Sequence, residues 1–183
     1  MSPQFSRLYR TKKILIFIII IIFFLLLFGA FSFYRSRQIT SVNQQNLSLN
    51  DWLFHQPDGS IHDFYLDDKQ IQLEIANKMT SREKGLSGRS RIGADGLLLV
   101  FSRPDYYGIW MKEMQFDIDI VWLKEGKVID ITRQVKAPSP QTPLTDLPVY
   151  YSQTKADLVL EVPSGMIESN RIYKGSELRI NND

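Results

Sequence analysis

The stretch that decides the fold class is IDIVWLKEGKVIDITRQV, residues 118–135. Two runs rich in β-branched residues, 118–123 and 128–135, flank the pair Glu125-Gly126. Runs of this length and composition are typical of strands, and a short turn that contains glycine joins antiparallel neighbours. The stretch therefore predicts a β-hairpin.

Strand patterns continue on both sides of this hairpin. Residues 71–76 alternate apolar and polar side chains, as a half-buried strand does, and 97–101 is a continuous apolar run of strand length. Residues 158–162 and 177–180 are predicted as late strands. Residues 52–54 and 61–66 flank Pro57-Asp58-Gly59-Ser60, which predicts a further hairpin.

Helices are predicted to be few and short. Thr80 and Glu83 match a capping box, which predicts a helix that starts at Thr80 and stops near Gly88. Ser164 is a possible cap for a helix of one or two turns. Four prolines within residues 137–148 predict a long loop. With no βαβ alternation expected, the prediction is a mainly β (α+β) domain: a small β barrel or rolled sheet with one or two short helices.

A separate segment precedes this domain. Residues 14–33 contain seventeen Ile, Leu or Phe residues and no charge. Twenty helical residues span about 30 Å, the thickness of a bilayer core, so a transmembrane helix is predicted. Small residues around Phe31 resemble a signal-peptide cleavage site, but the apolar run exceeds the usual ~7–15 residues of a signal peptide, which favours an uncleaved anchor.

The flanks of the segment predict its orientation and the arrangement of the chain. Four basic residues lie in the N-terminal stretch 1–13 and two directly after the apolar window. The positive-inside rule therefore predicts a cytoplasmic N-terminus, with the domain at 51–183 outside the cytoplasm at the cell membrane. Residues 34–50 are polar and lack periodicity, which predicts a tether. Membrane lipid, through residues 14–33, is the expected partner of the anchor.

Composition excludes several classes of function. Four of the 22 basic residues precede Tyr34, which leaves 18 against 20 acidic residues and a net charge of −2 on the remainder. This balance gives no electrostatic support for nucleic-acid binding. The absence of cysteine excludes disulfides, thiolate nucleophiles and Cys-ligated metals. No phosphate-binding, dinucleotide-binding or serine-nucleophile motif is found, so no cofactor and no catalytic residue is predicted.

Five short runs occur in a fixed order along the domain: GL at 85–86, DGLL leading to VF at 95–101, WMK at 110–112, DI at 119–120 and VLEVPSG at 159–165. Together they resemble the domain-of-unknown-function 192 family. The family pattern resembles GLM…GMLF…FWMKNT…VLEL, and the match covers about residues 71–180. The resemblance implies a compact β-rich domain, often behind a signal or anchor, with no established activity. This chain departs from the pattern at Ser87, Leu97, Glu113-Met114 and Asp117.

Trp110 and Lys112 are the first candidate ligand-binding residues. An aromatic face beside a cation suits a sugar or an acidic ligand, such as an envelope polysaccharide. In the alternative, structural interpretation, Ile109 and Met111 pack inward, Trp110 covers the barrel mouth and Lys112 is solvated. The structural interpretation is favoured.

Asp119 and Glu161 are the other candidates for ligand binding. Asp119 shares a strand face with Asp117 and with two apolar residues that follow it, so it is expected to be partly buried and paired with Lys112 or Arg133. Glu161 is predicted to be a second inward carboxylate. A structural role is favoured for Asp119, although carboxylate pairs also serve in glycoside hydrolysis.

Three hypotheses for function remain open. The first is a binding or accessory module of the cell envelope. The second is an envelope hydrolase or transferase that uses Asp119 with Glu161 or Asp117. The third is a structural partner of another membrane protein, which requires an exposed apolar patch. His55 and His62 are the only histidines, and no metal site is predicted from them.

Overall fold

The computed structural model describes residues 25–33 and 48–181. The chain divides after residue 47 into two units, and each is described by itself. Residues 25–33 are helical. Within the described ranges, no helix has the length and apolar character needed to cross a membrane. The predicted basic stretch at 1–13 and most of the predicted membrane window and tether lie outside these ranges.

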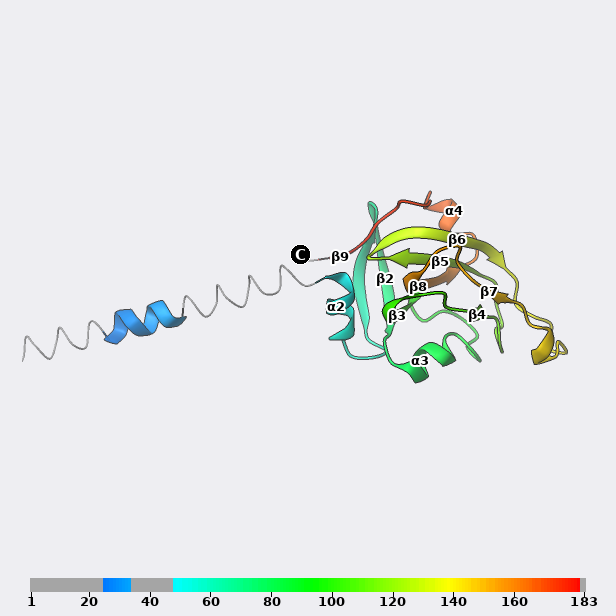
Figure 1. The fold of residues 1–183 in the computed structure, drawn as a ribbon, viewed down its shortest axis with the longest axis horizontal. Helices are drawn as coiled ribbons and strands as arrows, with labels where there is room; N and C mark the ends of the chain where they lie inside the picture. Colours follow the sequence, from blue (N-terminus) through cyan, green and yellow to red (C-terminus); the bar gives the residue numbers. More distant parts are fainter. Residues whose placement is uncertain (1–24, 34–47, 182–183) are drawn as a thin grey trace, which may run out of the picture. The chain divides into compact units, whose positions relative to one another are not determined.

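The second unit is a mainly β domain with a curled sheet, as Figure 1 shows. Seven strands form the main sheet in the order β6-β5-β8-β3-β2-β1-β9, and β4 and β7 form a separate pair. The strands are β1 (Ile61–Leu66), β2 (Lys69–Ala76), β3 (Gly96–Asp105), β4 (Ile109–Trp110), β5 (Ile118–Lys124), β6 (Lys127–Val135), β7 (Val149–Tyr150), β8 (Ala156–Pro163) and β9 (Leu178–Ile180). The helices are α2 (Leu49–Phe54), α3 (Met79–Lys84) and α4 (Met166–Ser169), with a 3-10 turn at Leu144–Asp146.

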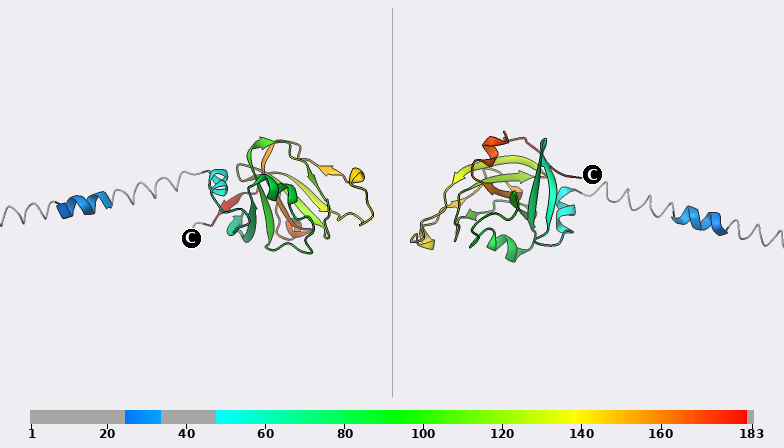
Figure 2. Two further views of the ribbon diagram at one scale, coloured as in Figure 1. Left: turned by 90° about the horizontal axis from the view of Figure 1, so that it is seen from below. Right: turned by 180° about the vertical axis from the view of Figure 1, so that it is seen from behind.

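The sheet curls until its two edge strands meet at one end. Lys127 of β6 forms an isolated bridge with Glu177, next to β9. Beside this bridge, Leu178 N–H donates to the Gly126 carbonyl at 2.8 Å. Figure 2 shows the resulting half-barrel from two further sides, with the proline-rich segment 137–148 projecting away from the sheet. The predicted mainly β, rolled-sheet architecture is confirmed.

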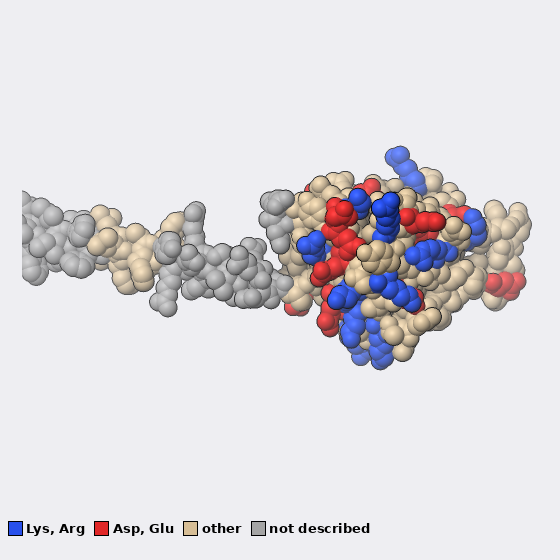
Figure 3. Space-filling view, turned by 90° about the horizontal axis from the view of Figure 1, so that it is seen from above, with Lys and Arg blue, Asp and Glu red and all other residues tan. Residues whose placement is uncertain are grey.

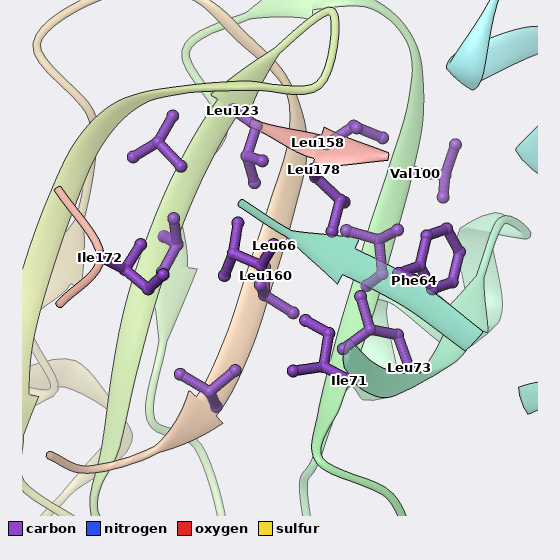
Figure 4. Packing of buried hydrophobic residues seen from close by; sticks show 14 of the residues in the cluster. Phe64, Leu66, Ile71, Leu73, Val100, Leu123, Leu158, Leu160, Ile172 and Leu178 are labelled. Carbon is purple, nitrogen blue, oxygen red and sulfur yellow. The ribbon is translucent and has the colours of Figure 1, made fainter. Parts of the chain in front are cut away.

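The continuous apolar runs of the sequence are strands buried on both faces. In β5, Ile118, Ile120 and Trp122 join one apolar cluster, whereas Val121 and Leu123 join another. Strands β3 and β8 also direct alternate side chains into the two clusters. The larger cluster fills the inside of the curl, where side chains from several strands point toward one another (Figure 4). The smaller cluster lies on the other face, and the candidate site is built on it.

The predicted hairpin at residues 118–135 is confirmed. Strands β5 and β6 pair antiparallel, and Glu125 and Gly126 turn with φ of 52° and 80°, the positive values of a tight hairpin turn. The predicted strands at 71–76, 97–101 and 158–162 are also present, and β9 contains three of the four residues predicted at 177–180. Residues 137–148 form a loop that contains the 3-10 turn.

The predicted hairpin across Pro57-Asp58-Gly59-Ser60 is wrong. Residues 52–54 belong to helix α2, because the Ser48 hydroxyl accepts the Asp51 N–H and caps the helix start. Residues 48–50, which were predicted as the end of the tether, belong to the domain. Strand β1 forms its hairpin with β2 instead.

The expectation of no βαβ unit is also wrong, because β2 and β3 are parallel neighbours connected through α3. The predicted caps are displaced as well: Lys78, not Thr80, is the N-cap of α3, and the helix ends at Lys84. The Asp58 carboxylate accepts the Lys78 N–H and the Ser81 hydroxyl, so a distant side chain determines where α3 begins. Similarly, Gly165, not Ser164, is the N-cap of α4.

Charges of both signs are interspersed on the side of the domain that carries α4 (Figure 3). Most of the described ion pairs are exposed or partly exposed, such as Lys136 with Asp117 at 2.7 Å. Exposed pairs of this kind contribute little to stability. The surface in this view is that of a near-neutral domain, as the composition predicts.

Candidate functional site

A cavity of about 880 Å³ opens on the face of the smaller apolar cluster. Its floor is formed by strands β3, β5 and β8, and its walls by α3 with the loop that follows and by the segment 107–114. Small-molecule sites in proteins are commonly apolar cavities of roughly 300–1,000 Å³ with a few convergent polar groups. The apolar lining comes mainly from Leu86, Leu99, Ile109, Met111, Met114 and Ile118.

Glu161 places a carboxyl group at the floor of this cavity. Along β8, Val159 and Glu161 face the smaller cluster, while the residues between and beside them face the inside of the curl. The Glu161 side chain is buried, and no donor in the described part of the chain lies within hydrogen-bonding distance of its Oε2. A buried polar atom without a partner is uncommon in folded proteins and requires an explanation.

The surroundings of Glu161 raise its pKa to about 7. Burial is the larger cause, because it disfavours the charged form. The positive charge of Arg89 acts in the opposite direction and lowers the pKa. Arg89 forms a bidentate ion pair with Glu74, at 2.6 and 2.8 Å, so its charge is shared with another carboxylate. Glu161 therefore exchanges its proton near neutral pH.

Gly85 forms the wall beside this carboxyl. A Cβ atom at residue 85 would lie 3.7 Å from Oε2 of Glu161, which is ordinary contact. The constraint comes from the backbone: Gly85 has φ of 50° and ψ of −129°, a region open essentially to glycine. The turn after α3 thereby brings the backbone close to the carboxyl group.

Two hydrogen bonds join the two walls of the cavity. The Ser87 hydroxyl donates to the Lys112 carbonyl at 2.7 Å, and Gly88 N–H donates to the Glu113 carbonyl at 3.0 Å. Glu113 adopts a φ of 56°, in the left-handed region where asparagine is better tolerated. The family pattern carries Asn at this position, so Glu113 keeps the turn at an energetic cost.

A stack of three side chains forms a further part of the wall. The Arg82 guanidinium lies 5.1 Å from the Phe101 ring centroid, and the Phe101 and Tyr107 rings are stacked. Arg82 also donates to the carbonyls of Asn77 and Val100. Its charge is thus held in place by backbone acceptors and an aromatic face.

Trp110 and Lys112 lie at the mouth of the cavity. Ile109 and Met111 are buried, while Trp110 is 44% exposed. The Lys112 ammonium lies 5.5 Å from the Trp110 ring centroid and only 3.9 Å from the carboxylate of exposed Glu113. Ile109 and Met111 pack inward as the structural interpretation expects, while Lys112 is only half-exposed. Trp110 and Lys112 both lie on the lining of the cavity.

Asp119 does not lie in the cavity. In the pairing of β5 with β8 it is opposite Val162, on the side of the sheet away from Glu161. Its carboxylate accepts the N–H groups of Gln134, Gly165 and Ile167, at 2.8, 2.9 and 3.3 Å. The prediction that Asp119 pairs with a cation is wrong, because these backbone N–H groups supply the hydrogen bonds that the carboxylate needs. Asp119 connects the end of β6 to the start of α4.

The other polar candidates have local roles. Asp117 pairs with Lys136 and accepts the Ala137 N–H at 2.9 Å, so it joins the two ends of the β5–β6 hairpin. His55 contacts the Asp51 carbonyl and His62 contacts the Ser60 hydroxyl. No group of three potential metal-binding side chains occurs among the described residues.

The structure places three of the four candidate residues named from the sequence on one cavity, and it adds several that the sequence analysis missed. Trp110, Lys112 and Glu161 line it, and Asp119 does not. Arg89 was missed because no local pattern links it to β8. The runs behind the family resemblance carried a usable signal, since Gly85-Leu86, Phe101, 110–112 and Glu161 all line the cavity.

The fold and the cavity define a small, mainly β domain with a hollow on one face of a curled sheet. The chain belongs to the domain-of-unknown-function 192 family, uncharacterized ACR proteins, whose model matches residues 54–180. No match is found among curated proteins.

Two solved structures are similar in fold. One, from Sinorhizobium meliloti 1021, is described as a candidate transcription regulator; it has 20% identity and a TM-score of 0.60, covering 68% of this chain and 97% of that one. The other, a protein of unknown function from Novosphingobium aromaticivorans DSM 12444, has 21% identity and a TM-score of 0.55, covering 65% and 84%. At such identities the likeness shows the fold alone.

Proposed function

We propose that this domain is a binding module whose cavity holds a small organic ligand, with Glu161 as the polar anchor. The observation that carries the proposal is that Glu161 lines an open cavity while its buried Oε2 lacks a hydrogen-bond partner among the described residues. Leaving a buried acceptor unsatisfied costs about 1–3 kcal/mol. A ligand that donates a hydrogen bond there removes that cost, which favours binding at this position.

Binding is preferred over hydrolysis because the described acidic residues offer Glu161 no suitable second carboxylate. Glu74, which shares Arg89 with Glu161, is held in a bidentate ion pair. Asp119 lies on the opposite face of the sheet, with its oxygens occupied by backbone N–H groups. The other acidic residue on the cavity lining is Glu83, which is exposed on α3. Hydrolysis by paired carboxylates needs both groups beside the bond that is cleaved.

We also propose that residues 14–33 anchor the protein in a membrane, with the domain displayed outside the cytoplasm as an accessory module of the cell envelope. Support comes from the charge-free apolar window, the excess of basic residues before it, and the polar stretch that follows. Ligands from an envelope polysaccharide, or a membrane-protein partner that presents such a ligand, fit this location.

A fragment screen tests the binding proposal. Fragments are added to the full-length protein and the melting temperature is measured for the wild type, for Glu161→Leu and for Glu83→Gln. A ligand at 100 times its Kd stabilises the protein by about 2.7 kcal/mol. Stabilisation of the wild type and of Glu83→Gln, with loss in Glu161→Leu, is expected. If no fragment stabilises the wild type, or if hits act equally on Glu161→Leu, the proposal is wrong.

A further inference from the structure

The charges on the cavity lining are separated by depth and sign. Glu161 lies at the floor, and the basic residues Arg82, Lys84, Arg103 and Lys112 line the cavity together with one exposed acidic residue, Glu83. Arg82 is held by backbone carbonyls and Phe101, which leaves Lys84, Arg103 and Lys112 as the basic groups for a ligand. Of these, Lys112 also has a partly exposed ion pair with Glu113 at 3.9 Å, which a ligand's acidic group would replace or share. The remaining charged neighbour of Glu161 is Arg89, which is paired with Glu74.

From this separation, and resting on the proposed function, we infer that the ligand is an amine-bearing organic acid. Its amino group is held by Glu161 at the floor, and its acidic group lies among Lys84, Arg103 and Lys112. The cavity volume of about 880 Å³ leaves room for a molecule of dipeptide size.

Simpler ligands satisfy only one end of this arrangement. A plain amine satisfies Glu161 but gains nothing from the basic residues, which repel it. A plain acid is attracted by the basic residues but leaves Oε2 of Glu161 without a donor. An ammonium group supplies both hydrogen bonds and the opposite charge, and a charge-assisted hydrogen bond is roughly twice as strong as a neutral one.

The inference predicts how the affinity for the ligand changes with pH. Glu161 must be ionised to hold an ammonium group, and its pKa in the empty cavity is raised to about 7. Binding of the amine therefore releases a proton below neutral pH, and affinity increases as the pH rises from about 5.5 to 8. A ligand that accepts a hydrogen bond from protonated Glu161 has the opposite dependence, so the sign distinguishes the two classes.

The test uses three matched probe series: linear ω-amino acids of graded length, and the alkylamines and alkanoic acids of the same lengths. The full-length protein is purified in a mild detergent and labelled with ¹⁵N in its tryptophan side chains. Binding is followed through the indole signal of Trp110 at the cavity mouth. The signals of Trp52 and Trp122, which lie away from the cavity lining, are internal controls.

The expected result is that the best ω-amino acid binds at least ~10-fold more tightly than the matched amine or acid, with affinity rising through pH 7. In Glu161→Gln, this probe should bind no better than the matched acid. Tighter binding of plain acids, or affinity that falls as pH rises, overturns the inference but leaves a Glu161 binding site. If no probe of the three series, and no fragment of the broader screen, shifts the Trp110 signal, the proposed function fails as well.

Discussion

Replacing Glu161 by glutamine should make the domain more stable at alkaline pH and leave its stability unchanged at acidic pH. Glutamine has nearly the shape of a protonated glutamic acid and carries no charge. The ordinary pKa of this carboxyl is 4.5, and burial raises it to about 7 in the folded protein. Each pKa unit corresponds to 1.36 kcal/mol, so the difference amounts to about 3 kcal/mol.

The sign follows from the proton balance. Below pH 4.5 the carboxyl is protonated in both the folded and the unfolded states, so wild type and variant are equally stable. Between pH 4.5 and 7 the unfolded state loses this proton while the folded state keeps it, and the free energy of unfolding falls. Above pH 7 the loss is complete. Glu161→Gln does not undergo this titration and should be about 3 kcal/mol more stable than wild type at pH 8.

The assay is a series of thermal melts of both proteins from pH 4 to 8, analysed as the difference in melting temperature at each pH. For a domain of this size, 3 kcal/mol corresponds to roughly 10 °C. The difference should grow from near zero at pH 4 to that value at pH 8. Glu83→Gln removes an exposed carboxyl from the cavity rim and should differ from wild type by less than about 0.5 kcal/mol throughout. A difference for Glu161→Gln that stays constant across this range would refute the reasoning.

Three further predictions concern the framework and the anchor. Asp119→Ala removes the acceptor of three backbone N–H groups and should lower stability by about 3 kcal/mol or more in a chemical denaturation experiment. The loss should be much larger than that of Asp117→Ala at the half-buried position two residues earlier, and equal effects would contradict the assigned role. Glu113→Asn relieves the left-handed strain and should raise stability by about 0.5–1 kcal/mol, and a loss in the same experiment would show that the Glu113 side chain is needed. The full-length protein should fractionate with membranes and be released only by detergent. Protease added to intact cells should cut within residues 34–47. Release of the intact chain by a salt wash would exclude the anchor.

Strands that the sequence marks by their own composition were predicted correctly. The β5–β6 hairpin, β3 and β8 are apolar runs with a local turn or a uniform character, and burial on both faces follows from that composition. Glu161 could be placed on the face of Val159 by alternation alone. In these cases, the residues that determine the secondary structure and the buried face lie within a few positions of the residue concerned.

The errors occurred where a helix cap or a distant residue decides the outcome. Residues 52–54 have apolar side chains that suit a strand, but Ser48 caps them into a helix. Asp58 was explained by turn chemistry, yet its carboxylate fixes the start of α3 more than twenty positions along the chain. The partners of Asp119 come from β6 and the start of α4, and spacing in one strand does not reveal them. Tertiary hydrogen bonds override the local pattern at Asp58 and Asp119, whereas the Ser48 cap is a local signal that the strand interpretation missed.

The pairing of β1 with β9 has a consequence for how the chain acquires its structure. Phe64 lies opposite Ile180, so the first and last strands of the domain are neighbours in the sheet. Contacts between such distant segments slow folding, because a long loop must close before they form. During synthesis, β1 and β2 leave the ribosome early, but the outer edge of β1 stays unpaired until residues 178–180 emerge. An unpaired edge invites pairing with other chains. A nascent chain of this protein is therefore most prone to aggregate just before its last strand appears, and a chaperone that protects β1 until then would improve its yield.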